Sequence, residues 1–201
     1  VPLAMIGVEA YRNYQRSRSA PWVQTYKWPI LCFISVGFWN VIGAGLLGFS
    51  INTPIALYYM QGMNMTAAHG HAALFGVYGM LGIGLLLFCL RGLSSRAAWS
   101  DRLLQPMFWS LNIGLGMMVF MSLVPAGIYQ AWASITHGVW FARSPEVIHS
   151  KAMEALVWLR VPGDVVFAIG ILFLALFALR LFRGGKSVVA EAVPVAQPEA
   201  V

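Results

Sequence analysis

Four long stretches with little charge limit what this chain can fold into. They cover about residues 28–49, 67–90, 104–124 and 156–181. A helix of about 20 apolar residues crosses the hydrocarbon core of a bilayer. Helices and closed barrels are the two structures that satisfy all their backbone groups there, and the sequence lacks the alternation typical of strands. The sequence therefore predicts an all-α transmembrane bundle of about four spanning helices.

The composition supports a membrane protein and argues against a nucleic-acid partner. The 201 residues are 59% hydrophobic and 10% charged, whereas soluble domains carry about 25% charged residues. The net charge is +6, but the basic residues cluster at the ends of the apolar stretches and form no polar face. Cys32 and Cys89 match no metal or redox motif, so we do not expect a disulfide.

The distribution of basic residues predicts the orientation in the membrane. One side would carry Arg12, Arg16, Arg18, Lys27, Arg91, Arg96, Arg102, Arg180, Arg183 and Lys186, and the other only Arg143, Lys151 and Arg160. Because cytoplasmic loops are enriched in Lys and Arg, the first side is predicted to be cytoplasmic, together with the C-terminus.

The chain divides into three predicted parts. Residues 1–18 are expected to be the end of a truncated preceding helix followed by a cytoplasmic loop. Residues 19–185 would form the membrane segment, and residues 186–201, rich in Val, Ala, Pro and Glu, a disordered tail. Within the third span, Pro125 predicts a kink or an end, with helix continuing to about Trp140.

Two histidines open the second span in the sequence His69-Gly70-His71. An ionisable residue within a membrane span is by default a candidate for a functional site. Residues i and i+2 of an α-helix point about 200° apart, so the pair cannot chelate one metal ion. They can instead bind two partners on opposite faces, and neutral imidazole is a common axial ligand of haem iron. We therefore predict that residues 67–90 form a haem-ligating helix, the alternative being that both side chains only pack.

Small residues surround the two histidines. Ala68, Ala72 and Gly76 recur every four positions. Such a row allows close approach of a second helix, and it would equally let a flat macrocycle lie against the helix. The sequence leaves both uses open.

Several segments resemble bacterial nitric oxide reductase, a family of the haem–copper oxidase superfamily. They are residues 43–54, Tyr58-Tyr59-Met60-Gln61-Gly62, and residues 69–80, 130–134, 142–146 and 159–164. The resemblance extends over about residues 28–182 and corresponds to the C-terminal part of that enzyme. The Tyr58–Gly62 run is more similar to the quinol-dependent, single-chain form than to the cytochrome c-dependent form.

The resemblance implies specific cofactors and an activity. His69 would ligate the high-spin haem b3 and His71 the low-spin haem b, in a respiratory enzyme of the bacterial inner membrane that reduces two NO to N2O and water with electrons from quinol. The motifs for the non-haem iron and for the second ligand of haem b do not occur here. The chain is thus expected to need an upstream part of the same enzyme and to be inactive alone. A dimer stays open.

Asp164 is a candidate for contact with quinol. It lies near the start of the fourth span within Val161-Pro162-Gly163-Asp164, which resembles a region lining the quinol pocket. Trp158 and Arg160 are weaker candidates for the same pocket. The alternative is an ion pair between Asp164 and Arg160, which is four residues earlier on the same helix face.

Two other functions compete with the quinol-dependent reductase. A cytochrome c-dependent reductase or an oxygen-reducing relative would use the same haem ligands with a different electron donor or acceptor. A structural or transport module would use the histidines only for packing. A haem spectrum would exclude this last alternative.

Overall fold

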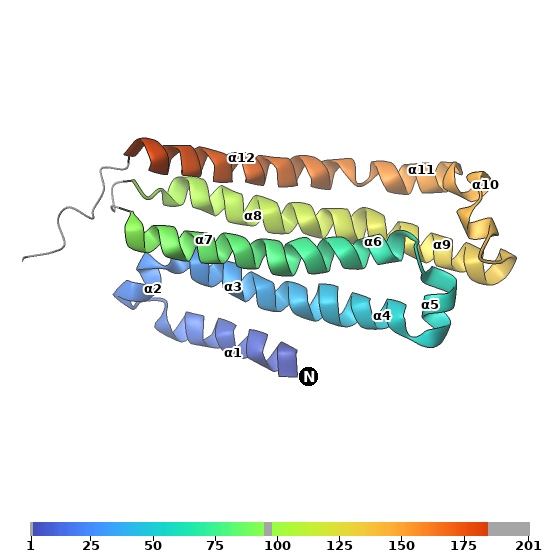
Figure 1. The fold of residues 1–201 in the computed structure, drawn as a ribbon, viewed down its shortest axis with the longest axis horizontal. Helices are drawn as coiled ribbons and strands as arrows, with labels where there is room; N and C mark the ends of the chain where they lie inside the picture. Colours follow the sequence, from blue (N-terminus) through green and yellow to red (C-terminus); the bar gives the residue numbers. More distant parts are fainter. Residues whose placement is uncertain (1, 95–97, 185–201) are drawn as a thin grey trace, which may run out of the picture.

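Four long helical spans lie side by side in the computed structural model, which describes residues 2–94 and 98–184 (Figure 1). The spans are Lys27–Asn52, Asn64–Leu93, Asp101–His137 and Lys151–Arg183. Every regular element among the described residues is helical. The predicted all-α transmembrane bundle is confirmed, and each span is longer than its apolar stretch. The tail predicted for residues 186–201 lies outside the described residues.

The first two spans each contain a π-helical segment. The first consists of α3 (Lys27–Trp39), the π-helix η1 (Asn40–Leu47) and α4 (Gly48–Asn52). It ends before Pro54, which begins the short helix α5 (Pro54–Met60). The second span consists of α6 (Asn64–Gly70), the π-helix η2 (His71–Gly79) and α7 (Met80–Leu93). Single π-helical turns often mark functional sites in helices.

The third span also changes its helical type at mid-length. It runs through α8 (Asp101–Met117), the π-helix η3 (Met118–Leu123) and α9 (Val124–His137). Pro125 does not end the helix, because it lies in the first turn of α9, directly after η3. Proline lacks a backbone N–H, so one hydrogen bond of the continuous span is missing at this junction between η3 and α9.

The fourth span is interrupted near its start. After the short helices η4 (Phe141–Arg143) and α10 (Pro145–Ile148), it begins with α11 (Lys151–Trp158) and continues as α12 (Val161–Gly184). Proline has no N–H to donate to the carbonyl four residues earlier, and its ring clashes with that carbonyl, which for Pro162 belongs to Trp158 at the end of α11. The break at residues 159–160 is therefore explained by Pro162, just inside α12.

The N-terminal segment differs from its prediction. Helix α1 (Pro2–Ser17) includes Arg12 and Arg16, which were expected in a loop, whereas Arg18 follows the helix in a turn. The side chain of Gln15 donates a hydrogen bond to the hydroxyl of Tyr11, with 2.8 Å between Nε2 and the oxygen. This i, i+4 contact, together with the good helix propensity of Arg, extends the helix. Helix α2 (Pro21–Thr25) then leads into the first span.

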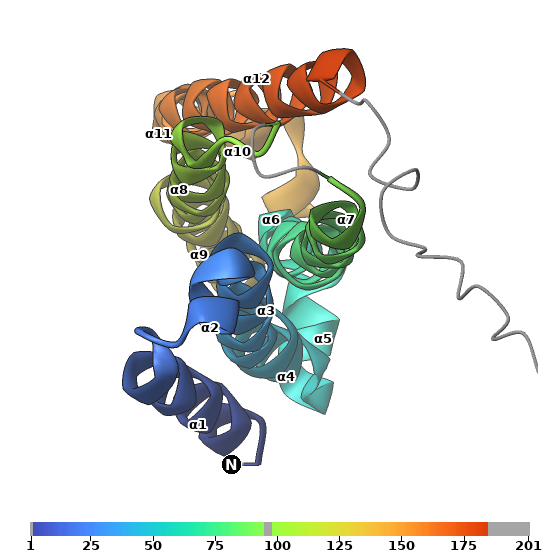
Figure 2. The same cartoon turned by 90° about the vertical axis from the view of Figure 1, so that its left-hand side faces the viewer.

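Glycines set the closest packing between the spans. A methyl group at Gly114 in α8 would lie 2.5 Å from the backbone nitrogen of Phe167, and one at Gly163 would lie 2.7 Å from that of Met118. Helix α12 is therefore in backbone contact with the third span, as Figure 2 shows end-on. The outer faces carry exposed large apolar side chains, as expected of helices that contact lipid.

Basic residues that were predicted to share one side of the membrane lie, where the structure describes them, at one end of the bundle. The start of α3, the end of α7, the start of α8 and the end of α12 all lie there, whereas α5 and α10 lie at the opposite end (Figure 1). Arg96 and Lys186 were assigned to that side too, but they lie outside the described residues.

Candidate functional site

The histidine helix is anchored at its start by a buried glutamine from the third span. Gln130 accepts two hydrogen bonds from Asn64, one from the backbone nitrogen and one from the side-chain amide, both at 2.9 Å. Beside it, a methyl group at Gly127 would lie 2.5 Å from the backbone nitrogen of Met65. These contacts fix the position at which α6 begins, five residues before His69.

His69 is held by the first span. Its Nδ1 lies 2.8 Å from the carbonyl oxygen of Gly43. Because a carbonyl oxygen only accepts hydrogen bonds, Nδ1 must donate and carries the proton. A methyl group at Gly48 would lie 3.0 Å from Cε1 of His69, so the ring lies directly against this glycine. In the neutral imidazole, Nε2 is left with its lone pair available for a metal.

His71 is held by its own helix. Its Nδ1 lies 2.9 Å from the carbonyl oxygen of Ala67, one turn earlier. The same reasoning places the proton on Nδ1 and the lone pair on Nε2. Metal-ligating histidines generally donate their other ring N–H to a carboxylate, a backbone carbonyl or water. Both histidines have such an acceptor, so the donor set fits the binding of haem iron through Nε2.

The change from α- to π-helix falls between the two histidines. His69 belongs to α6, and His71 is the first residue of η2. The acceptor of His69, Gly43, also lies in a π-helix, η1, and η1 packs against η2. These π segments were not predicted from the sequence, although both coincide with glycine-rich stretches.

The row of small residues beside the histidines is occupied by helix packing. Ala68, Ala72 and Gly76 are all buried. A methyl group at Gly43 would lie 2.7 Å from Cβ of Ala72, and one at Gly76 would lie 2.5 Å from Cγ of Trp39. Of the two uses that the sequence left open, this row serves the approach of the first span.

The three predicted quinol residues lie at the break in the fourth span. Arg160 and Asp164 form an ion pair, with 3.1 Å between Nε and Oδ1, and both side chains are more than one-third exposed. Trp158, at the end of α11, is 72% exposed. The structure thus brings Arg160 and Asp164 together in the ion pair that was weighed as the alternative to a quinol contact.

An aromatic contact connects this helix to the histidine helix. The rings of Phe75 in η2 and Phe167 in α12 pack edge to face, with 4.6 Å between their centroids. Phe75 follows His71 by four residues, and Phe167 follows Asp164 by three. The two predicted sites are therefore neighbours through packed side chains.

Asn112 is a polar residue of the site region that was not predicted from the sequence. Its Oδ1 accepts hydrogen bonds from Ser35 Oγ at 2.7 Å and from Trp39 Nε1 at 2.9 Å. Its Nδ2 donates to the carbonyl oxygen of Phe108 at 2.8 Å. Asn112 thereby orients the indole ring that packs on Gly76. The available signal was an amide side chain within an apolar span, where polar groups need partners.

The described residues contain no group of three or more His, Cys, Asp or Glu side chains that could hold a metal ion. The ligands that the site offers are thus two separate imidazoles. Together with the spans, this defines a multi-pass membrane protein in which one helix carries two imidazoles, two residues apart, each with its Nδ1 on a backbone carbonyl.

The comparisons with known proteins identify the family. Residues 17–166 match the family described as "Cytochrome C and Quinol oxidase polypeptide I", so the chain belongs to this haem–copper oxidase family. A nitric oxide reductase subunit from Stutzerimonas stutzeri is 31% identical over 159 residues. The match covers 77% of this chain and 32% of the relative, so the chain spans about a third of that protein's length.

Proposed function

We propose that this chain is the haem-ligating portion of a respiratory nitric oxide reductase that takes electrons from quinol. His69 holds the high-spin haem b3, and His71 holds the low-spin haem b. The observation that carries the proposal is that both histidines donate Nδ1–H to backbone carbonyls, which leaves Nε2 of each as a ligand atom. The similarity to the nitric oxide reductase of Stutzerimonas stutzeri supports the substrate.

Backbone groups of this chain orient the two histidine rings that are proposed to ligate the haems. The carbonyl groups of Gly43 and Ala67 each hold a proton on Nδ1, and this contact fixes the orientation of each ring with Nε2 free to act as the ligand atom. The bound haems would supply one-electron chemistry and a coordination site for NO. Gly48 and Gly43 keep the first span close enough for the contact to His69 to form. The non-haem iron and the second ligand of haem b would come from an upstream part of the same enzyme.

The overall reaction is balanced with two electrons and two protons. Two NO molecules combine with them to give one N2O and one water. Oxidation of one quinol to quinone supplies both electrons and releases two protons. Asp164 is proposed to accept a quinol proton, with Arg160 fixing its carboxylate and Trp158 at the edge of the same pocket. Partial exposure of all three side chains supports access for a ligand.

The identity of the electron donor is the part of the proposal for which an alternative function exists. A cytochrome c-dependent reductase, or an oxygen-reducing oxidase, would keep His69 and His71 as ligands. Either would not depend on Asp164. Quinol-driven and cytochrome c-driven turnover of the same preparation therefore distinguish these alternatives.

The proposed location is the bacterial inner membrane. The end of the bundle that carries Arg91, Arg102 and Arg180 would face the cytoplasm, because positively charged loops are retained on that side. The histidines belong to the half of their span nearer the opposite end, which would be the periplasmic side.

The ligand assignment is tested by optical and EPR spectra of the complete enzyme with His69→Ala and His71→Ala. The expected result is loss of the high-spin signal for the first variant and of the low-spin signal for the second. His149→Ala is the matched control, because this histidine is exposed and lies outside the site. If neither substitution changes the haem content, the histidines only pack and the proposal is wrong.

A further inference from the structure

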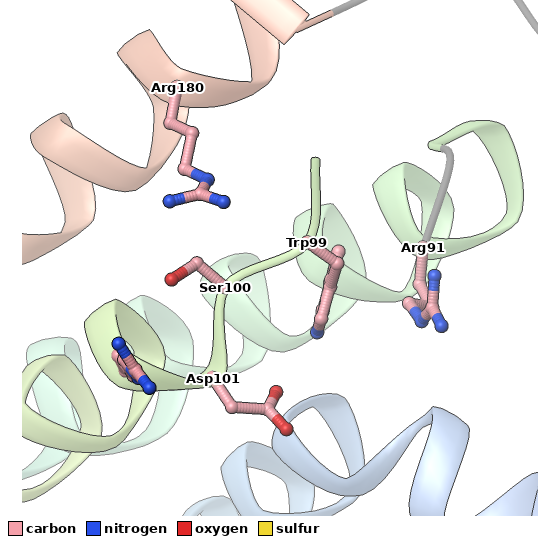
Figure 3. A pocket seen from close by; sticks show the side chains of 6 residues that line it. Arg91, Trp99, Ser100, Asp101 and Arg180 are labelled. Atoms are coloured by element: carbon pink, nitrogen blue, oxygen red, sulfur yellow. The ribbon is translucent and has the colours of Figure 1, made fainter. Parts of the chain in front are cut away.

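A cavity unconnected with the histidines opens at the basic end of the bundle. Its volume is about 470 Å³, and it lies where α7 ends, α8 begins and α12 ends. Its lining residues are Arg91, Trp99, Ser100, Asp101, Arg102 and Arg180 (Figure 3). Three cations thus surround the cavity together with one carboxylate.

Two of the arginines are held in place by backbone carbonyls. Arg91 donates from Nε to the carbonyl oxygen of Thr25 at 3.1 Å, and its guanidinium lies 5.0 Å from the ring centre of Trp99. Arg180 donates from Nε to the carbonyl oxygen of Ala98 at 3.3 Å and extends from α12 towards the cavity (Figure 3). These bonds use Nε and position the guanidinium groups at the cavity wall.

The start of α8 adds two features that favour an anion. The first N–H groups of a helix have no partner within the helix, and the helix dipole makes this end positive. Ser100, the residue at the N-cap, is only 8% exposed and lines the cavity. Its hydroxyl does not cap the helix and has no hydrogen-bond partner in the described part of the chain. Figure 3 shows this hydroxyl on the side of the cavity that Arg180 approaches.

The single carboxylate is directed away from this group. Asp101 accepts a hydrogen bond from the indole nitrogen of Trp28 at 2.8 Å, which ties it to the first span. In Figure 3 its side chain extends on the opposite side from Arg180. The cavity wall therefore carries three arginines, and its one carboxylate is tied to the first span.

We propose that this cavity binds the phosphate group of an anionic phospholipid. Phosphate is an anion that both helix N-termini and arginines bind well. Basic pockets between spans at the membrane surface match lipid headgroups. Leu176 lies one turn before Arg180 on the same face of α12, and both it and the adjacent Leu179 are exposed, so they offer an apolar surface for acyl chains. A soluble phosphate would use the cavity but not this surface.

The proposal is tested by native mass spectrometry of the complete enzyme. The delipidated protein is incubated with vesicles containing equal amounts of phosphatidylglycerol and phosphatidylcholine. The wild type is expected to retain phosphatidylglycerol selectively. Arg102→Gln is expected to weaken this retention about fivefold, the effect of one basic residue near a membrane. Ser100→Ala, which keeps every charge, is expected to weaken it roughly two- to tenfold through loss of one hydrogen bond.

Arg183→Gln is the matched control, because it removes one exposed arginine at the same end but outside the cavity. It should retain the lipid like the wild type. Unchanged haem spectra of all three variants will show that each has folded. Equal retention in the wild type and Arg102→Gln would overturn the proposal. The same holds if inorganic phosphate alone binds in an Arg102-dependent manner without any preference between the two lipids.

Discussion

The glycine beneath His69 offers a sharp test of the site geometry. A methyl group at position 48 would lie 3.0 Å from Cε1 and 3.3 Å from Nδ1 of the histidine ring. Ordinary van der Waals contact begins at 3.4 Å, so Gly48→Ala forces the ring away by roughly 0.4 Å. The ring is also held at 2.8 Å from the carbonyl oxygen of Gly43, so it cannot move without disturbing that hydrogen bond.

The size of the effect follows from this hydrogen bond. Partners that orient a metal-ligating histidine typically contribute about 10- to 100-fold to metal affinity. A displacement of a few tenths of an ångström weakens the bond without removing it. We therefore expect Gly48→Ala to weaken retention of the haem at His69 about tenfold. The haem at His71 should be retained, because the acceptor of His71 is Ala67 in its own helix.

The assay is the ratio of high-spin to low-spin haem in the complete enzyme, measured by EPR and related to total haem. Gly82→Ala is the matched control, because a methyl group there meets no atom within 4 Å and lies in the same span as His69. Equal loss of both haems would indicate general destabilisation and refute the reasoning. So would an unchanged ratio in Gly48→Ala, because the ring would then be free to move.

Three further predictions concern the packing of Trp39 and the carboxylate of Asp164. Gly76→Ala forces a methyl group to 2.5 Å from Trp39, which is 1% exposed, and should destabilise the protein by about 1–3 kcal/mol, measured as a lower thermal midpoint. Asn112→Ala leaves the Trp39 indole N–H without its acceptor and should cost ~1–3 kcal/mol in the same assay. Asp164→Asn breaks a partly exposed ion pair with Arg160 worth less than ~1 kcal/mol, so the midpoint should hardly change. Quinol-driven turnover should fall in this last variant, because the carboxylate proposed to accept a quinol proton is lost.

Each of these expectations has a clear contradiction. A Gly76→Ala midpoint equal to that of Gly82→Ala would mean that the first two spans separate easily. An unchanged midpoint for Asn112→Ala would show that water replaces the lost acceptor. Wild-type quinol turnover in Asp164→Asn would leave the ion pair as the sole role of this carboxylate.

The apolar stretches predicted the spans because a bilayer imposes one simple condition on each of them. Every backbone group in the hydrocarbon core must bond within its own helix, so length and lack of charge are sufficient signals. The continuation of the third span past Pro125 was predicted, and the helix reaches His137. Other helical segments at the ends of the spans were not predicted, because they are polar and depend on local contacts. The helix through Tyr11 and Gln15 is one example, and the anchoring of Asn64 by Gln130 is another.

The histidine pair shows where sequence and tertiary structure divide. The i, i+2 spacing alone required two separate partners, because the helix repeat sets the directions of the two side chains. The sequence did not reveal the acceptor of His69, since Gly43 is 26 residues away and its carbonyl reaches the ring only after two π-helical segments pack together. The sequence also did not reveal whether the small residues Ala68, Ala72 and Gly76 pack against another helix, because that depends on which helix the fold brings next to them. Sequence by itself determined that one helix carries two imidazoles pointing in different directions. Tertiary packing decided which ring nitrogen of His69 carries the proton, because that depends on a carbonyl group brought close only by the fold.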